Sequence, residues 1–517
     1  MLQPCRRLAL FAVILFASHS AMAQSIQSSE SPEYWPTHGW RSTTPEQQGL
    51  DSNKLADVLD YARAHKINIH SLLIVRNGYV VLDAYFYPYN ETNVHDVASV
   101  TKSVTSMLIG AAIQQGKIKS VQQPVLALFP DRTVSNRDAR KEKITIENLL
   151  TMTSGLDCQW KENEKTLREM KESDDWAQFM LNLPMVDEPG RSFVYCSGGT
   201  HLLSAVLSQT TGKSGQDFAR QSLFRPLGIS DDIWPADSNG INHGWGDLHL
   251  YPRDMAKLGY LFLNQGMWDG KRIISADWVK ESTRAHTGTG TESDYGYGWL
   301  VKSRMNPLIY EATGRGGQRI TMIPAKNMIV VFTGGGFQPG EIGNLLVGVV
   351  ASDQALPVNP AGVARLKESV RAVAQPTEKK PAAPLPEIAG IVSGKPYFFE
   401  TNSLGLKSIS FTFSSPEDAS VQLVFTNRPT EMHHIGLNEV PYISKNGRFG
   451  LPVGLTGYWE NKNTFVLDYD EIANINAYRL QVNFSPQQVK VAITERSANL
   501  KVNLVGKTQS PQALSQK

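Results

Sequence analysis

Ser99 and Lys102 are the residues of this sequence whose types and spacing most directly suggest chemistry. They lie in His95-Asp96-Val97-Ala98-Ser99-Val100-Thr101-Lys102, which runs into an apolar stretch from Met107 to Ile113. Residues three apart on a helix share one face. An unprotonated lysine placed there can accept the proton that a serine must lose before it attacks a carbonyl. Because the same pattern also occurs by chance in ordinary solvated helices, residues further along the chain decide its meaning.

Tyr195 and Ser197 form a second candidate group. They lie in Phe193-Val194-Tyr195-Cys196-Ser197-Gly198-Gly199, just before a predicted helix. A tyrosine at such a junction can project its phenol into a cleft and exchange protons with a serine. The alternative is a packing tyrosine whose hydroxyl is tied to the backbone.

Gly314-Arg315-Gly316-Gly317-Gln318 is the third candidate segment, at the start of a predicted strand. Glycines at such a place let the backbone approach a ligand closely. The N–H of Gln318 and the N–H of Ser99 could together form an oxyanion hole, which needs two donors. The alternative is a plain turn.

The hydrophobic pattern predicts the elements that must position these groups. Two apolar runs around Asn77-Gly78, within residues 72–82, indicate a β-hairpin. A buried helix over residues 97–115 should end at Gly116. Further segments with a clear pattern are helices at 146–152, 199–210, 254–265, 276–284 and 343–350, and strands at 318–323 and 328–333. Strands thus flank a long helical insertion, which favours one antiparallel sheet with helices packed against it.

Taken together and in this order, Ser99-x-x-Lys102, Tyr195-x-Ser197 and Arg315-Gly316-Gly317 resemble the three motifs of the serine β-lactamase and penicillin-binding protein superfamily. The spacing is most similar to its class C-like branch, which includes β-lactamases, D-alanyl-D-alanine carboxypeptidases, esterases and 6-aminohexanoate-dimer hydrolases. The resemblance covers about residues 44–351. It implies an α+β, β-lactamase/transpeptidase-like domain: an antiparallel sheet flanked by helices, with a mainly helical insertion.

The resemblance also implies a role for each motif residue. Ser99 would be the nucleophile, Lys102 with Tyr195 the proton-transfer pair, and the backbone amides of Ser99 and Gln318 the oxyanion hole. The implied substrate-binding positions are Ser197, Arg315, Gly316 and Gly317.

Arg315 departs from the family pattern, because many members carry lysine or histidine there. Arginine stays charged and is a poor proton shuttle, but it binds carboxylates bidentately. We therefore expect Arg315 to hold an anionic substrate group. The alternative is an outward-facing arginine paired with protein carboxylates. Because lactam-cleaving members usually keep lysine, the arginine favours ester or amide substrates over β-lactams.

Residues 1–23 have the pattern of a secretory signal peptide: Arg6 and Arg7, an apolar run over 8–17, and Ala21-Met22-Ala23 at the cleavage site. The apolar run is too short to span a bilayer, so no membrane anchor is expected. The sequence therefore predicts a periplasmic or secreted protein.

Composition divides the remaining chain into a serine hydrolase domain over 24–373, a linker over 374–386 and a β-rich domain over 387–517. The linker, AQPTEKKPAAPLP, cannot pack a core. Short strands in the last domain are expected at 407–413, 420–426, 464–469, 478–484, 489–494 and 500–505. They predict a small all-β sandwich or barrel, which could shape the cleft entrance, contact an envelope polymer or only stabilise the fold.

Cys158 and Cys196 are the two cysteines that remain after the signal peptide. In an oxidising compartment they are candidates for one disulfide, and the alternative is two buried thiols.

Neither the charge nor the histidines point to a further ligand. A formal net charge of +2 gives no reason to expect nucleic acid. His243, Trp245 and His249 cluster within residues 242–249, and the two histidines with Asp247 between them could suggest a metal site, but no further ligand has a convincing spacing. Neither a metal nor another cofactor is expected, and these residues fit the wall of a cleft.

The sequence therefore predicts an exported serine hydrolase that cleaves small ester or amide substrates, with β-lactams still open, through an acyl-enzyme on Ser99. One alternative is a catalytically silent protein, similar to penicillin-binding proteins, that binds or senses a ligand. A D-amino-acid cell-wall peptidase is another. A third makes the β-rich domain a polymer-binding module carried by the hydrolase.

Overall fold

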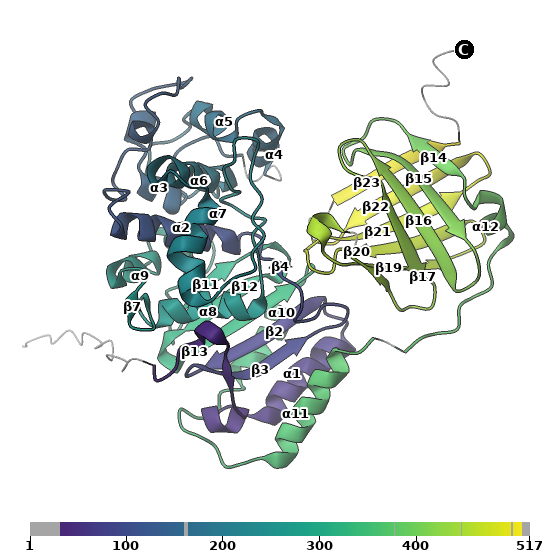
Figure 1. Ribbon diagram of the computed structural model, residues 1–517, viewed down its shortest axis with the longest axis horizontal. Coiled ribbons are helices and arrows are strands. Elements are labelled where there is room, and N and C mark those ends of the chain that lie inside the picture. Colours follow the sequence, from purple (N-terminus) through teal and green to yellow (C-terminus); the bar gives the residue numbers. More distant parts are fainter. Residues whose placement is uncertain (1–31, 160–163, 377, 446, 498–499, 509–517) are drawn as a thin grey trace, which may run out of the picture. The chain divides into compact units, whose positions relative to one another are not determined.

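The first domain is built around a nine-stranded sheet (Figure 1). The computed structural model describes residues 32–159, 164–376, 378–445, 447–497 and 500–508. The strands lie in the order β1-β3-β2-β13-β12-β11-β10-β9-β8. Their bounds are Arg41–Ser42 (β1), Ile69–Arg76 (β2), Tyr79–Tyr85 (β3), Thr287–Gly288 (β8), Asp294–Tyr295 (β9), Leu300–Lys302 (β10), Ile309–Thr313 (β11), Arg319–Ile323 (β12) and Met328–Gly334 (β13). All pairs are antiparallel except β1 with β3.

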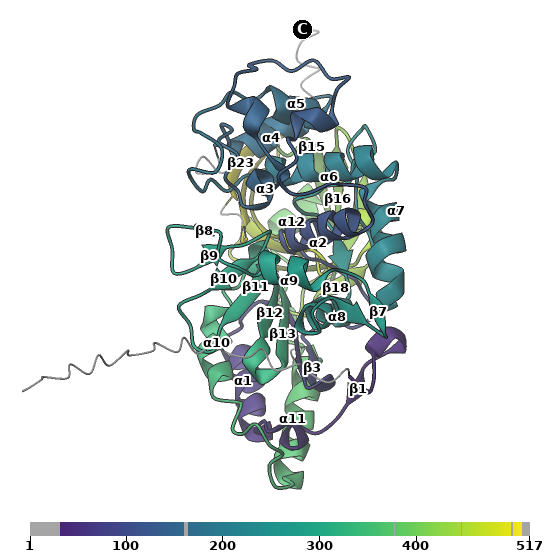
Figure 2. The ribbon, with the colours of Figure 1, turned by 90° about the vertical axis from the view of Figure 1, so that its left-hand side faces the viewer.

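Strand β2 shows why the sheet is covered on both faces. All eight of its residues are buried, and successive side chains point to opposite sides of a strand. Leu72 and Ile74 join one apolar core, whereas Leu73 and Val75 join another. The first core includes α1 (Ser52–Ala64), α10 (Gly340–Val347) and α11 (Pro360–Val373), and the second includes α2 (Val100–Gln114) and α8 (Pro252–Leu263). Figures 1 and 2 show α1 and α11 on one face and α8 on the other.

The helical insertion buries α2, the helix that begins after Ser99. The further helices of this domain are α3 (Ile146–Leu150), α4 (Lys165–Glu172), α5 (Trp176–Asn182), α6 (Ser197–Thr211), α7 (Gly215–Ala219) and α9 (Ala276–Ser282). Two short ribbons complete it: β4 (His95–Asp96) with β5 (His249–Leu250), and β6 (Met267–Trp268) with β7 (Lys271–Arg272). Helix α2 is apolar on almost all sides and buried along nearly its whole length. A helix of this kind must lie inside the domain.

The second domain is a closed β-barrel preceded by α12 (Glu387–Val392). Its strands are β14 (Pro396–Phe399), β15 (Leu406–Phe413), β16 (Asp418–Phe425), β17 (Glu431–Gly436), β18 (Tyr442–Ser444), β19 (Val453–Trp459), β20 (Thr464–Asp470), β21 (Ala477–Phe484), β22 (Gln488–Glu495) and β23 (Leu500–Lys507). A contact between β17 and β19 closes the sheet. Aromatic rings fill the interior, among them Phe411, Phe413, Phe465 and Phe484. The described residues from Tyr34 onward form one compact unit.

The expected α+β fold class, with a smaller all-β domain after it, is confirmed. The hairpin forms as predicted, and Asn77 and Gly78 have the positive φ angles, 51° and 78°, that its turn requires. The helix expected at 343–350 instead covers Gly340–Val347. Residues 1–23 lie outside the described part of the chain. In the described part of 374–386 there is neither helix nor strand. No helix within the described ranges is both long and apolar enough to cross a lipid bilayer.

Truncating Phe465 tests whether aromatic side chains pack tightly in the barrel interior. Phe465 is fully buried and packs on Phe411, Phe413 and Trp459. Phe465→Ala should lower the free energy of unfolding by about 3–5 kcal/mol, because it leaves a cavity. Val505→Ala, at a site 48% exposed on β23, should change it by about 0.5 kcal/mol or less. Urea unfolding followed by tryptophan fluorescence gives both values, and equal effects would contradict a packed interior.

Candidate active site

Ser99 and Lys102 meet at the first turn of α2. Ser99 is the N-cap residue, and the Lys102 Nζ lies 2.9 Å from the Ser99 Oγ. A second hydrogen bond, 3.0 Å long, runs from Nζ to the carbonyl oxygen of Trp245. The Lys102 side chain is only 1% exposed. The amine is thus held against the hydroxyl from two sides, in the position that a base for this serine must take.

Tyr195 forms the second side of the site. The Lys102 Nζ lies 4.8 Å from the centroid of the Tyr195 ring, over its face. The residue after Tyr195, Cys196, forms a disulfide with Cys158 and caps the N-terminus of α6. The Cα atoms of the two cysteines are 5.5 Å apart. Ser197, the first residue of α6, is buried, and its Oγ donates to the Glu164 carboxylate over 3.2 Å.

The Gly314–Gln318 segment forms the third side and lies directly against the residues that precede Ser99. A Cβ atom at Gly314 would stand 2.5 Å from the Val97 carbonyl oxygen and 3.0 Å from the Ala98 Cβ. Only glycine allows this approach. The Gln318 side chain is fully buried and is bound on both ends to the backbone of Gly334, at 2.6 and 3.1 Å. That contact fixes the start of β12, where the proposed oxyanion donor lies.

Arg315 contacts the barrel domain. Its Nη2 donates to the Asn476 Oδ1 over 2.9 Å, and its Nη1 donates to the Ser497 hydroxyl. Both partners belong to the barrel. Both are neutral oxygens, whereas the alternative interpretation expected protein carboxylates as partners.

Buried polar residues support the backbone just before Ser99. The Asp96 carboxylate accepts a 2.7 Å hydrogen bond from the Ala98 N–H. The His95 Nδ1 donates to the Asp96 carbonyl over 2.8 Å, and the His70 Nδ1 donates to the His95 Nε2 over 2.8 Å. Burial and the nearby Arg496 charge lower the pKa of His70 to about 3. Burial and the neighbouring His70 also lower the pKa of His95 well below its usual value. Both rings are therefore neutral, as this chain of hydrogen bonds requires.

His243 and Asp247 stand next to Trp245, whose carbonyl oxygen accepts from Lys102. The His243 ring stacks on Trp245 with centroids 4.7 Å apart, and its Nδ1 is 2.7 Å from the Asp247 carboxylate. Burial alone would raise the pKa of Asp247, but the hydrogen bond to His243 and the charge of Arg448 hold this pKa below its usual value. Nowhere in the described ranges do three histidine, cysteine or acidic side chains gather as a metal ion would need.

The fold and these three motifs define a serine hydrolase-type site. The family model described as Beta-lactamase matches residues 55–347, more than half of the chain. This chain belongs to the β-lactamase family, whose members are in general serine hydrolases, and the resemblance inferred from its motifs is confirmed.

Individual relatives are distant. An uncharacterised protein of Alkalihalophilus pseudofirmus is 24% identical over 341 residues, which cover 58% of this chain and 92% of that protein. The 6-aminohexanoate-dimer hydrolase of Paenarthrobacter ureafaciens is 23% identical over 282 residues, covering 50% of this chain and 71% of the hydrolase. A solved family VIII carboxylesterase is 17% identical, with a TM-score of 0.47 and coverage of 64% of this chain and 98% of its own.

The structure brings together the three motifs that sequence singled out. Three other contributors were not foreseen: the Trp245 carbonyl as a partner of Lys102, the His70–His95 pair, and the barrel residues on Arg315. One feature of the sequence could have indicated that a barrel loop is buried against the site. Residues 471–476, Glu-Ile-Ala-Asn-Ile-Asn, are unusually apolar for a turn between two strands.

Replacing Lys102 tests the proton-transfer pair. Lys102→Met keeps the bulk of the side chain but removes the amine beside Ser99, so kcat should fall by about 10³-fold. Lys141→Met is the matched control, because Lys141 is also 1% exposed but donates to the carbonyls of Ser135, Leu181 and Leu183. It should lower stability and leave kcat per folded molecule unchanged. Equal losses of kcat would contradict a chemical role for Lys102.

Gly314→Ala tests the close approach of the third motif. The added methyl group would meet the Val97 carbonyl, and the resulting shift should lower kcat about tenfold or more. Gly343→Ala in α10 has open space around its Cβ. It should keep full activity and gain up to about 1 kcal/mol of stability. Steady-state kinetics of both variants would refute the argument if Gly314→Ala remained fully active.

Proposed function

We propose that this protein is an exported serine hydrolase that cleaves small esters or amides through an acyl-enzyme on Ser99. The observation that carries the proposal is the 2.9 Å contact between the Lys102 Nζ and the Ser99 Oγ in a site that buries the lysine. Membership of the β-lactamase family supports it.

The proposed reaction begins when unprotonated Lys102 takes the Ser99 proton and the serine oxygen attacks the substrate carbonyl carbon. The backbone N–H groups of Ser99 and Gln318 stabilise the oxyanion. Tyr195, whose ring lies beside the lysine amine, donates its phenol proton to the leaving group and takes back a proton from Lys102, which restores both groups. Water then attacks the acyl-enzyme by the same route, and the carboxylic acid product leaves.

Arg315 favours an esterase or short-amide hydrolase over a β-lactamase. Arg315 replaces the lysine that lactam-cleaving members usually carry, and its two terminal nitrogens contact barrel residues. These contacts make it less available to the carboxylate of a lactam substrate.

Export is part of the proposal. The signal-like residues 1–23 motivate it, and the bond between Cys158 and Cys196 supports it, since disulfides persist in oxidising compartments. Fractionating cells that express the full chain should place the mature protein outside the cytoplasm.

The first test of the function follows p-nitrophenol release from p-nitrophenyl butyrate by the mature protein. A burst followed by steady turnover is expected, because acylation and deacylation are separate steps. Ser99→Ala should abolish both phases. Ser106→Ala is the matched control on α2: its Oγ is buried without a partner among the described residues, so activity should be unchanged.

Other outcomes discriminate between the remaining functions. A burst without turnover would favour a ligand-binding or sensor protein that stays acylated. No difference between the protein and Ser99→Ala would refute the ester hydrolase, and β-lactam and D-amino-acid peptide substrates should then be assayed in the same way.

A further inference from the structure

The loop between β20 and β21 of the barrel is buried, which is unusual for a hairpin loop. Glu471, Ile472, Ala473, Asn474 and Ile475 are each 6% exposed or less. Hairpin loops normally lie at the surface, where water satisfies their backbone groups. This one is covered by the hydrolase domain, where the Ala473 carbonyl and the side-chain oxygens of Asn474 and Asn476 find partners.

One end of the loop contacts the segment that leads to the nucleophile. The Asp96 N–H, three residues before Ser99, donates to the Ala473 carbonyl over 2.9 Å. The Asn474 amide lies 2.8 Å from the His249 Nε2, and both side chains are buried. Asp96 and His249 also pair with each other in the β4–β5 ribbon. The loop therefore packs against the two-stranded ribbon that leads to Ser99.

The other end of the loop contacts the third motif. The Ile475 Cγ2 occupies the space beside Gly316, where a Cβ would stand 2.3 Å from it. The next residue, Asn476, accepts from the Arg315 Nη2, and Ser497 accepts from Nη1. The loop therefore extends from the segment before the nucleophile to Arg315.

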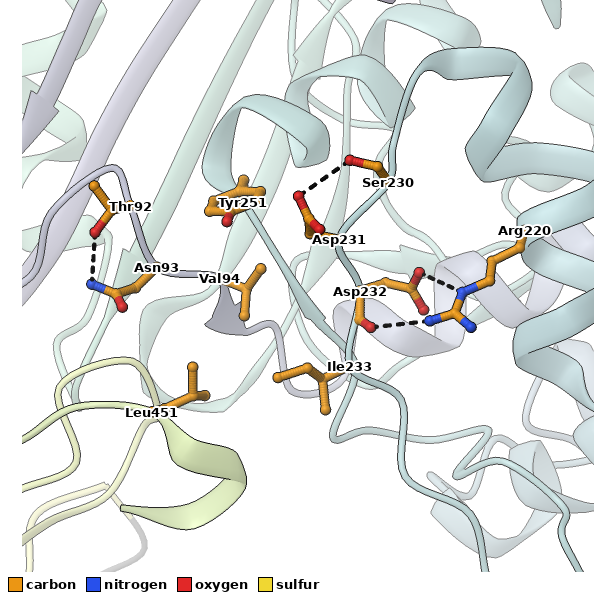
Figure 3. A pocket seen from close by; sticks show the side chains of 10 residues that line it. All are labelled: Thr92, Asn93, Val94, Arg220, Ser230, Asp231, Asp232, Ile233, Tyr251 and Leu451. Carbon is orange, nitrogen blue, oxygen red and sulfur yellow. Dashed lines mark hydrogen bonds and ion pairs between the residues drawn. The ribbon is translucent and has the colours of Figure 1, made fainter. Parts of the chain in front are cut away.

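Apolar packing holds the loop in this place. Ile472 and Ala473 form one cluster with Tyr85, Tyr89 and Val94 of the hydrolase domain. Leu451 of the barrel extends the cluster, and Figure 3 shows it facing Val94 and Ile233 across a pocket of about 340 Å³. A second barrel residue, Arg448, adds an ionic contact to the hydrolase domain, because its guanidinium lies 3.9 Å from the Asp247 carboxylate.

The barrel oxygens have partners of their own that orient them toward Arg315. The Asn476 Nδ2 donates to the Glu471 carboxylate over 3.2 Å, which turns its Oδ1 outward to the guanidinium. The Ser497 hydroxyl donates to Glu495 over 2.6 Å, so its oxygen is free to accept from Arg315. Each acceptor is thus fixed by a carboxylate behind it.

We propose that loop 471–476 is a wall of the active site, and that its Asn476, together with Ser497 after β22, binds the Arg315 guanidinium in place of a substrate carboxylate. This inference rests on the proposed function and specifies its substrate class: acyl groups that are uncharged at the end facing Arg315. A carboxylate that engaged the N–H groups aimed at the barrel would have to displace two oriented oxygens. Asn476 and Ser497 are specificity-determining residues that touch the reaction only through Arg315.

The test compares two ester series with the full-length mature protein. One series is the mono-p-nitrophenyl esters of glutaric, adipic and suberic acid, and the other is the neutral p-nitrophenyl esters of the same chain lengths. The wild type should prefer the neutral esters. Asn476→Ala/Ser497→Ala frees both terminal nitrogens of Arg315. The ratio of kcat/KM for charged over neutral ester should then rise about tenfold for at least one chain length.

Three controls identify the cause of such a rise. Asn483→Ala/Ser485→Ala makes the same residue changes elsewhere in the barrel, where Asn483 contacts Thr464, and should leave the ratio unchanged. Adding Arg315→Ala to the Asn476→Ala/Ser497→Ala variant should remove the rise in the ratio. Ser497→Ala alone removes only one acceptor, so it should give a smaller gain in the same direction if the double variant fails to fold.

The outcomes separate this inference from the function on which it rests. If no variant cleaves the neutral esters in a Ser99-dependent way, the proposed function itself is wrong. If the neutral esters are cleaved but the ratio stays constant, the barrel oxygens do not govern specificity. A gain that persists without Arg315 would likewise overturn the inference.

Discussion

The hydrogen bond between the buried Lys102 amine and the Ser99 hydroxyl is the contact on which the rest of this structure depends. A lysine can lie inside a protein only where oxygens satisfy its donors, and here the second oxygen is the Trp245 carbonyl, from a loop almost 150 residues away. Helix α2 must be covered on nearly all sides to hold the pair in place. The long helical insertion supplies that cover, and the sheet supplies the floor.

Close approach of backbone is the second requirement. The three motifs come from distant parts of the chain, and the Gly314 contact with Val97 shows how little space separates them. Directly before the nucleophile, Asp96 and two neutral histidines fix the backbone through a row of short hydrogen bonds. The backbone is thus held in place where the serine must be aimed.

The sequence alone predicted the parts of this protein that local pattern determines. The β2–β3 hairpin, the buried helix after Ser99 and most barrel strands follow from periodicity and turn residues. Helices α1 and α11 were missed, because their apolar faces are narrow and their burial depends on each other. The partners of Arg315 could not be predicted, since a motif shows which residue is present but not which distant loop reaches it. The position of Lys102 over the Tyr195 ring is likewise a product of tertiary packing.

The buried loop of the barrel has a consequence for how such a protein can diverge. Loop 471–476 belongs to a domain that carries none of the three motifs, yet its residues contact both the segment before Ser99 and the Arg315–Gly316 motif. Substitutions in six barrel residues can therefore reshape the pocket while serine, lysine and tyrosine stay intact. If the loop has the specificity role proposed above, selectivity and chemistry are encoded in separate parts of the gene, and descendants can change one without losing the other.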